Sequence, residues 1–200
     1  MDYTSKHPYK PFIPEDATKL IIGTMPPYRF CHKDQANLLK DDVDFYYGSR
    51  DNYFWELVSD AVGTELHFEN TKEAVDERKA LLTRLHMGIT DMVVQCTHKD
   101  GRSDDDSLEN IQFNDIATLL YEHPQIDTLI YTSNKVASMV NNVSDKKYHE
   151  KWDKTRKNGI VLINHKVYSV HILYSPSPSA LRNISKETRA KCYKEIFKIG

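Results

Sequence analysis

The chain has 200 residues, of which 40% are hydrophobic and 28% are charged, and its mean hydropathy is −0.61. This length suits a single domain with a substantial buried core, and no apolar run approaches the roughly 20 residues that a membrane-spanning helix needs. The net charge of −2 excludes a globally basic nucleic-acid-binding protein, although a local basic stripe can still bind nucleic acid.

Cysteine usage and the first residues indicate a compartment. The three cysteines, Cys31, Cys96 and Cys192, are odd in number and far apart, which argues against a disulfide framework. The chain starts without the apolar segment of a signal peptide. We therefore expect a cytoplasmic protein with no membrane partner.

The beginning of the chain predicts an extended lead-in followed by a rigid loop. Three prolines fall within residues 1–18, and we expect one domain over 19–200. Residues 20–22 (Leu-Ile-Ile) predict a buried strand, and residues 23–27 (Gly-Thr-Met-Pro-Pro) a stiff loop at its carboxyl end. Ligands bind at that end of open α/β sheets, although a plain strand-ending turn is an equal alternative.

Residues 45–55 (Phe-Tyr-Tyr-Gly-Ser-Arg-Asp-Asn-Tyr-Phe-Trp) form an unusual stretch. Six of the eleven are aromatic in a chain that is 10% aromatic, and an Arg, an Asp and an Asn lie among the rings. This combination suits a pocket wall that stacks a flat ring beside a polar group.

The middle of the chain predicts alternating helices and strands. Helices are expected over 52–62, over 71–86 with Thr71 as N-cap, over 109–122 and over 134–143, and strands over 88–94 and 127–131. Within 88–94, Asp91 is either a polar group that faces a cleft or a structural hydrogen-bonding residue, and we favour the second. Residues 97–108 contain four aspartates; a metal site is conceivable there, but a solvated loop is favoured.

The last third predicts a hairpin, a second stiff loop and a helix. Residues 161–174 alternate loosely around an Asn164-His165 turn, residues 175–179 (Ser-Pro-Ser-Pro-Ser) form the loop, and Ser185 caps the final helix. Strands that alternate with helices predict a three-layer α/β/α sandwich with a mostly parallel sheet.

Two basic stripes could bind nucleic acid, although solvated faces are the favoured interpretation of both. They comprise Lys146, Lys147, Lys151, Lys154, Arg156 and Lys157 in the first, and Arg182, Lys186, Arg189, Lys191 and Lys194 in the second.

The sequence lacks the motifs of several common classes of enzyme. The chain has no Gly-rich phosphate loop, no dinucleotide fingerprint, no Gly-x-Ser-x-Gly and no His/Cys spacing for zinc. The loops 23–27, 132–134 and 175–179 and the aromatic stretch remain, and together they can form a pocket for a flat polar ring.

With these segments in this order, the chain resembles the uracil-DNA glycosylase superfamily over residues 19 to about 198. Residues 23–27 match its first Gly-x-x-Pro loop, and residues 47–55 resemble the aromatic–His-Pro-x-Asn-x-Phe-Trp segment of its mismatch-specific and hypoxanthine-type branches. Residues 88–93 (Gly-Ile-Thr-Asp-Met-Val) resemble its Gly-Leu-Thr-Asp/Asn strand, and 175–179 its second, Ser-Pro-Ser-type motif.

This resemblance implies a central sheet of four parallel strands, with DNA across their carboxyl ends, and an enzyme that flips a deaminated or modified base and hydrolyses its N-glycosidic bond. Tyr47 would stack on the base. The other residues that the resemblance assigns are, around the base, Gly23, Thr24, Met25, Pro26 and Asn134, and, on the DNA backbone, Ser175, Pro176, Ser177, Pro178, Ser179 and Arg182.

The first motif departs from the family pattern. Many members have Asn or Asp where this chain has Met25, which can neither orient nor activate water. The hypoxanthine-type branch also lacks that residue, so the resemblance implies that Asn52 orients the water, with Asp51 as a weaker candidate. Asn52 can also act as a helix N-cap, and the two roles are compatible. Ser49 and Arg50 replace the usual His-Pro, which leaves the excised base open.

No lysine lies in the motif loops, so we expect a monofunctional enzyme that needs neither metal nor cofactor and acts as a monomer. Two alternatives from other classes stay open. One is a non-catalytic DNA- or nucleotide-binding relative, and the other is an α/β hydrolase of free nucleosides.

Overall fold

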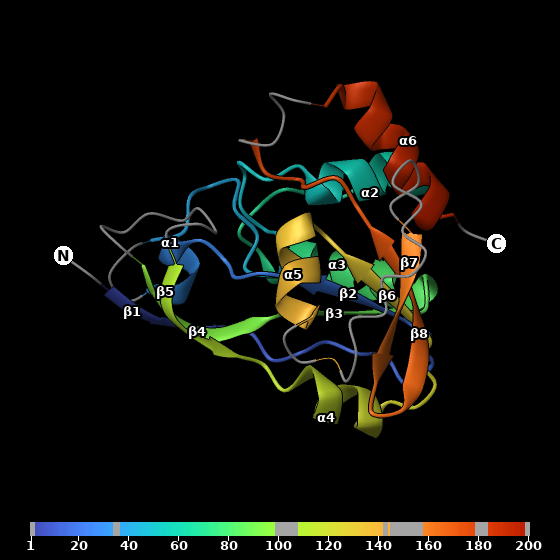
Figure 1. Cartoon of the computed structure of the whole chain (residues 1–200). Coiled ribbons are helices and arrows are strands. Elements are labelled where there is room, and N and C mark those ends of the chain that lie inside the picture. The colour runs from blue at the N-terminus through green and yellow to red at the C-terminus, as the bar shows by residue number, and fades with distance from the viewer. Residues whose placement is uncertain are drawn as a thin grey trace.

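A computed structural model describes residues 3–33, 37–98, 108–141, 144, 158–178 and 184–198. Its centre is a five-stranded sheet in the order β3-β2-β6-β8-β7 (Figure 1). The first four strands are parallel, as expected, and β7 adds an antiparallel edge. The strands span Lys19–Gly23 (β2), Met87–Asp91 (β3), Thr128–Tyr131 (β6), Asn158–Ile163 (β7) and Lys166–Ile172 (β8).

Helices cover both faces of this sheet, which confirms the three-layer α/β/α sandwich. Alternate residues of β2 point to opposite sides: Leu20 and Ile22 join one buried cluster, and Ile21 joins the other. The first cluster includes side chains of α4 and α5, and the second includes those of α2, α3 and α6. Figure 1 shows α6 beside α2. The helices span Phe54–Val62 (α2), Lys72–Arg84 (α3), Ile116–Glu122 (α4), Asn134–Asn141 (α5) and Lys186–Ile196 (α6).

Local signals set several boundaries where they were predicted. The side chain of Thr71 accepts a hydrogen bond from the amide of Ala74, and that of Ser185 from the amide of Thr188, so both are N-caps. Asn164 and His165 both have positive φ (49° and 61°), as a two-residue hairpin turn between β7 and β8 requires.

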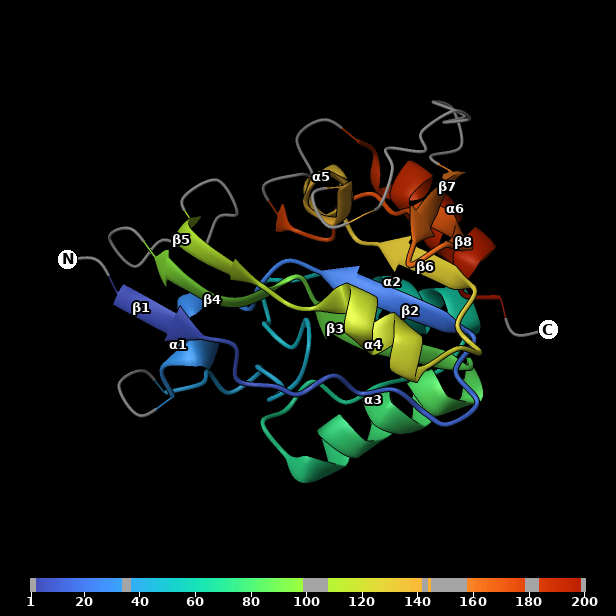
Figure 2. The same ribbon diagram turned by 60° about the horizontal axis from the view of Figure 1, so that its bottom comes forward.

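A second sheet projects to one side of the first (Figure 2). It is antiparallel, in the order β1-β4-β5, and the short helix α1 lies against it. These elements span Tyr3–Lys6 (β1), Tyr28–Cys31 (α1), Val93–His98 (β4) and Leu108–Phe113 (β5).

Two predicted elements are wrong in this region. The single strand expected over 88–94 is two strands, because the chain leaves the main sheet at Met92, whose amide donates to the carbonyl of Gly23 (2.9 Å). The helix expected over 109–122 begins only at Ile116, after Asp115 caps it. The residues before it form β5 and not a further helical turn, because they pair with β4 in an antiparallel ladder.

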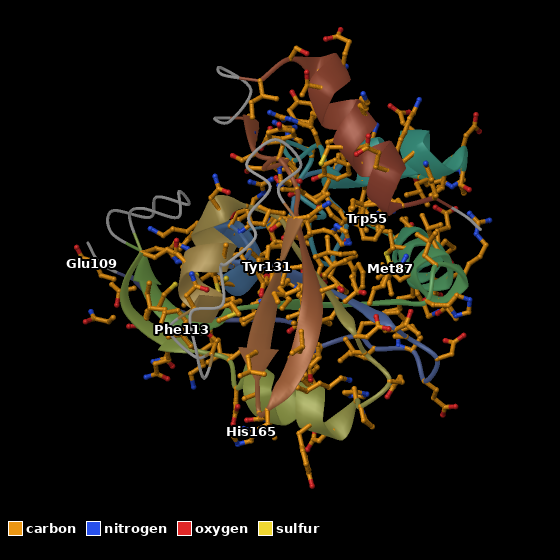
Figure 3. The ribbon with its side chains drawn as sticks, turned by 45° about the vertical axis from the view of Figure 1, so that its right-hand side comes forward. Trp55, Met87, Glu109, Phe113, Tyr131 and His165 are labelled. Atoms are coloured by element: carbon orange, nitrogen blue, oxygen red, sulfur yellow. The ribbon has the colours of Figure 1, made fainter. Side chains whose placement is uncertain are left out.

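The lead-in follows the body of the domain. β1 pairs with β4, and Phe12 forms an antiparallel bridge with Ile89 of β3. Figure 3 shows the extent of the molecule: Glu109 and Phe113 lie on β5, Trp55 and Met87 on the side of α2 and α3, and His165 at the tip of the β7–β8 hairpin. Within the described ranges, no helix is long and apolar enough to cross a membrane.

Candidate active site

A cavity of about 610 Å³ lies where the four parallel strands end. Each strand contributes a lining residue at or just beyond its carboxyl end: Thr24 for β2, Asp91 for β3, Thr132 for β6 and Ser175 for β8. Cavities of this size accept a small ligand, and this edge of an open α/β sheet is the usual binding position.

Most of the residues that the sequence assigned to the site line this cavity. Gly23 lies beneath it, and Asn134 is exposed while its neighbours Ser133 and Lys135 line the cavity instead. Ser179 and Arg182 fall outside the described residues. The predicted residues that line the cavity are Thr24, Met25, Pro26, Tyr47, Asp51, Asn52, Ser175, Pro176, Ser177 and Pro178.

Gly23 allows two side chains to close over the floor of the cavity. A Cβ atom at this position would lie 2.1 Å from the hydroxyl oxygen of Tyr47 and 2.2 Å from Oδ1 of Asp91. Both contacts are far shorter than any real Cβ contact, so only glycine permits this arrangement.

Tyr47 is held rigidly. Its ring stacks on Phe54, with 4.3 Å between centroids and 23° between planes, and its hydroxyl donates to Oγ1 of Thr132 (2.7 Å). Its φ of 56° lies in the left-handed region, which a tyrosine rarely adopts and which persists only where surrounding contacts enforce it. Since Phe54 stacks on one face of the ring, that face is closed to a ligand.

Asn52 lines the cavity just before the start of α2. The N-cap of α2 is Tyr53, so the N-cap predicted for Asn52 is wrong by one residue, but its Oδ1 still accepts a hydrogen bond from the amide of Phe54 (2.9 Å), the first residue of the helix. An amide oxygen has a second lone pair, and the NH₂ group has two donors. The side chain can therefore hold the helix and still bind a water in the cavity.

A buried ion pair fixes the loop that carries these residues. The carboxylate of Asp42 is fully buried and accepts from Nε (2.8 Å) and Nη2 (2.7 Å) of Arg29 and from the amides of Leu39 and Arg50. Burial acts to raise the pKa of Asp42, but these hydrogen bonds outweigh it and lower the pKa below its ordinary value. Asp42 is therefore a carboxylate that anchors the loop.

The same guanidinium reaches the cavity. Arg29 donates to Oγ of Ser49 (2.8 Å) and lies 3.4 Å from Oδ2 of Asp51. The hydrogen bond to Asp42 is the main cause that raises the pKa of Arg29. Arg29 thus brings a fixed positive charge to the wall that also carries Asp51.

Hydrogen bonds order the loop of residues 175–178 and link it to the aromatic stretch. The amide of Tyr53 donates to the carbonyl of Pro176 (3.1 Å), and the amide of Ser177 donates to Oγ of Ser175 (3.3 Å). The hydroxyl-rich loop is therefore ordered beside Asn52.

Sequence reasoning missed four residues that matter here. Arg29 and Lys135 line the cavity. Both come shortly after predicted loops in the sequence, and this proximity was the signal that could have identified them. Asp91, favoured as structural, lines the cavity. His7 contacts Asp91 from the lead-in, and nothing in its sequence context points there.

The interpretation of the second basic stripe as a solvated face is wrong at one residue. Arg189, counted in the second stripe, is 1% exposed because it lies on the inner side of α6, one turn from the buried Tyr193. The first stripe, from Lys146 to Lys157, lies outside the described residues. Among the residues that are described, no group of three His, Cys, Asp or Glu side chains is placed to hold a metal ion.

Comparison with known proteins supports the fold. No protein-family model matches the chain. No curated protein matches it either. Among solved structures, the chain is similar to the solution NMR structure of a putative uracil DNA glycosylase from Methanosarcina acetivorans, with a TM-score of 0.58 and 18% identity over 99% of this chain and 100% of that chain. At this identity, the likeness shows that the two chains share a fold.

Proposed function

We propose that the protein is a monofunctional DNA glycosylase that flips a deaminated or modified base out of DNA and hydrolyses its N-glycosidic bond. The observation that carries the proposal is the joint position of Tyr47 and Asn52 on one cavity at the carboxyl ends of the strands. The likeness in fold to the Methanosarcina protein supports it. Such an enzyme would serve base-excision repair or defence against modified DNA.

Base capture is the first requirement. Flipping costs a few kcal/mol of lost stacking and pairing, which is least at a mismatched or damaged base. A base stacked on the Tyr47 ring recovers about 1–3 kcal/mol. The Phe54 ring packed against Tyr47 keeps the tyrosine ring in position.

Hydrolysis follows from a held water. Met25 lines the cavity but has no group that can orient water. The Asn52 amide can hold a water against an oxocarbenium-like sugar, while hydrogen bonds stabilise the departing base. Asp51 is the second candidate, although its side chain is 61% exposed and paired with Arg29.

Contacts to the DNA backbone come from the second loop. The hydroxyls and amides of Ser175 and Ser177 can bind phosphates without reading sequence. Arg29 and Lys135 bring positive charge to the same cavity. Ser179 and Arg182, which lie outside the described residues, are proposed to contact the DNA backbone as well.

Because Lys135 lines the cavity, the proposal that the enzyme is monofunctional can be tested directly. An amine in the site could attack the sugar and form a Schiff base, which is the chemistry of a glycosylase with lyase activity. Borohydride reduction during the reaction traps such an adduct. We expect no trapped complex, and a trapped complex lost in Lys135→Ala would show lyase chemistry.

The proposal is tested with labelled oligonucleotides that carry uracil, hypoxanthine, xanthine or a modified pyrimidine, in single and double strands, followed by alkaline cleavage of abasic sites. Release of one of these bases supports the glycosylase. Tight DNA binding with no release from the whole panel would favour a binding protein. Release from free nucleosides alone would favour a nucleoside hydrolase.

A further inference from the structure

Two histidines of the small sheet share one serine hydroxyl. Oγ of Ser5 lies 2.8 Å from Nε2 of His32 and 2.7 Å from Nδ1 of His98. Ser5 belongs to β1, His32 follows α1 and His98 ends β4, and these three elements lie side by side (Figure 2). Ser5 and His98 are fully buried, whereas His32 is half-buried. One buried hydroxyl therefore joins three elements, and we call His32 and His98 the histidine pair.

A tyrosine of α1 packs against both rings of the pair. Tyr28 stacks on His32, with 4.3 Å between centroids and 22° between planes. It also meets His98 edge to face, at 5.9 Å and 90°. The two rings are thus held against Ser5 from the side of α1.

The histidine pair differs from the histidines that face carboxylates. Protonation strengthens an ion pair of that kind, because the opposite charge favours the charged ring. Such ion pairs among the described residues are His7 with Asp91, His67 with Glu77, and His86 with Asp16. Within the same described ranges, no Asp or Glu lies at ion-pair distance from either ring of the histidine pair.

The groups around the pair supply no negative charge. Sγ of Cys96 lies 4.0 Å from Nδ1 of His98, and burial raises the pKa of this thiol to about 11. Burial also raises the pKa of Cys31, on α1, to about 12. β5 places the apolar Leu108 opposite His98, and Lys33, next to the pair in the chain, is a cation. A positive charge on the pair is therefore not offset by an anion.

The shared hydroxyl can serve one bound proton but not two. A serine hydroxyl donates one hydrogen bond and accepts others. With no proton or one proton on the pair, Ser5 donates to one ring nitrogen and accepts from the N–H of the other. With two protons, both facing nitrogens carry hydrogen, so the buried hydroxyl finds no acceptor there and two positive charges face one oxygen. In accord with this, burial, and then His32, lower the pKa of His98.

The strand that carries Ser5 also supports the cavity. Two residues further on, the amide of His7 donates to the carbonyl of Val94 (2.9 Å), next to the β1–β4 ladder. The ring of His7 donates through Nε2 to Oδ2 of Asp91 (2.9 Å), which lines the cavity. β1 therefore holds this wall of the cavity while its ladder is closed.

We propose that Ser5 and the histidine pair form a pH-sensitive clasp, which holds β1 against α1 and β4 while the pair carries at most one proton and releases β1 when it takes a second. The open form binds both protons at the ordinary histidine pKa of 6.5, and the closed form resists the second, so opening is favoured as the pH falls below about 6.5. Release of β1 withdraws His7 from Asp91 while the main sheet stays folded. The clasp does not depend on the proposed glycosylase activity.

Amide hydrogen exchange, followed by NMR at about pH 7.5 and about pH 5.5, tests the clasp. We expect the protection factors of the amides of β1 and His7 to fall about tenfold over this range, which is the effect of one resisted proton about one pH unit below the ordinary pKa. The amides of β2 should keep theirs. His32→Gln and His98→Gln should each remove the loss at β1, because a glutamine amide can bond to Ser5 but does not titrate.

Two further variants serve as controls. His67→Gln changes an exposed histidine that pairs with Glu77, and it should leave the acid-dependent loss at β1 as in the wild type. Ser5→Ala removes the shared hydroxyl, so it should lower the protection of β1 already at about pH 7.5.

Three results would overturn the clasp. They are protection of β1 that does not change with pH in the wild type, an equal loss in the wild type and in both glutamine variants, and a parallel loss at β1 and β2, which reports global unfolding. None of them depends on base release, so a failure of the oligonucleotide assay and a failure of the clasp are distinguishable.

Discussion

The amide of Tyr53 donates a hydrogen bond to the carbonyl of Pro176, and this contact joins the two loops that form the candidate active site. Asn52 precedes one partner and Ser177 follows the other, and both line the cavity. The residue proposed to hold water and the loop proposed to hold phosphate are therefore fixed in position relative to each other. A DNA backbone bound on the second loop would place its sugar at a set distance from Asn52.

Asn52→Ala should reduce turnover by orders of magnitude and also lower the melting temperature. The second effect arises because the hydrogen bond to the Phe54 amide is lost, and a lost hydrogen bond of this kind costs about 0.5–1.5 kcal/mol. Asn52→Ser separates the two roles, since a serine hydroxyl can accept from the same amide but does not reach as far. We expect near-native stability and low turnover for Asn52→Ser; wild-type turnover would remove Asn52 from the mechanism.

Tyr47→Ala should lower kcat/KM by about tenfold to a hundredfold, because stacking on a captured base is lost. Tyr47→Phe keeps the ring and loses only the hydrogen bond to Thr132, so it should retain most of the activity. Steady-state kinetics and thermal unfolding of both variants check this. A change in stability alone would show that Tyr47 is only a core residue.

Gly23→Ala should abolish activity, because a Cβ atom displaces the Tyr47 hydroxyl and Asp91 together. Gly88→Ala is the matched control in the neighbouring strand: its Cβ would meet side-chain atoms of Ile13 and Leu20 at 3.1 and 3.2 Å, which can adjust. Activity and melting temperature are measured for both. Equal behaviour of the two variants would contradict the proposed close approach over Gly23.

Stability should fall as the pH drops below about 6.5. Burial, and then the neighbouring His32, lower the pKa of His98, and burial likewise lowers the pKa of His171. Below the ordinary pKa of 6.5 the unfolded chain binds protons that the folded chain resists, so acid favours unfolding. Melting temperatures from pH 8 to 5 should show this decline, and a smaller slope is expected in His98→Gln. An identical slope in that variant would exclude His98 as a contributor.

Much of the architecture could be predicted from local signals. Thr71 and Ser185 begin helices because a hydroxyl satisfies a free amide, and Asn164-His165 makes a hairpin because those residues tolerate positive φ. These preferences act within a few residues, so they are readable in the sequence.

The errors and omissions have a different cause. The apolar spacing after Leu108 fits a helix, but the residues up to Phe113 form a strand because they pair with β4. In the same way, the meeting of His7 with Asp91 depends on β1 pairing with β4 beside the main sheet. Contacts of this kind join segments that are distant in sequence, and no local pattern encodes them.

The position of β1 has a consequence for heat tolerance. It is a strand of four residues at the edge of the small sheet, and β4 is the strand with which it pairs. Short edge elements open locally at a lower free energy than a central sheet. Fraying of β1 would withdraw His7 from Asp91 while β2, β3 and β6 stay folded. On warming, Asp91 should then lose its fixed orientation before the domain melts, so the wall of the cavity would loosen ahead of global unfolding.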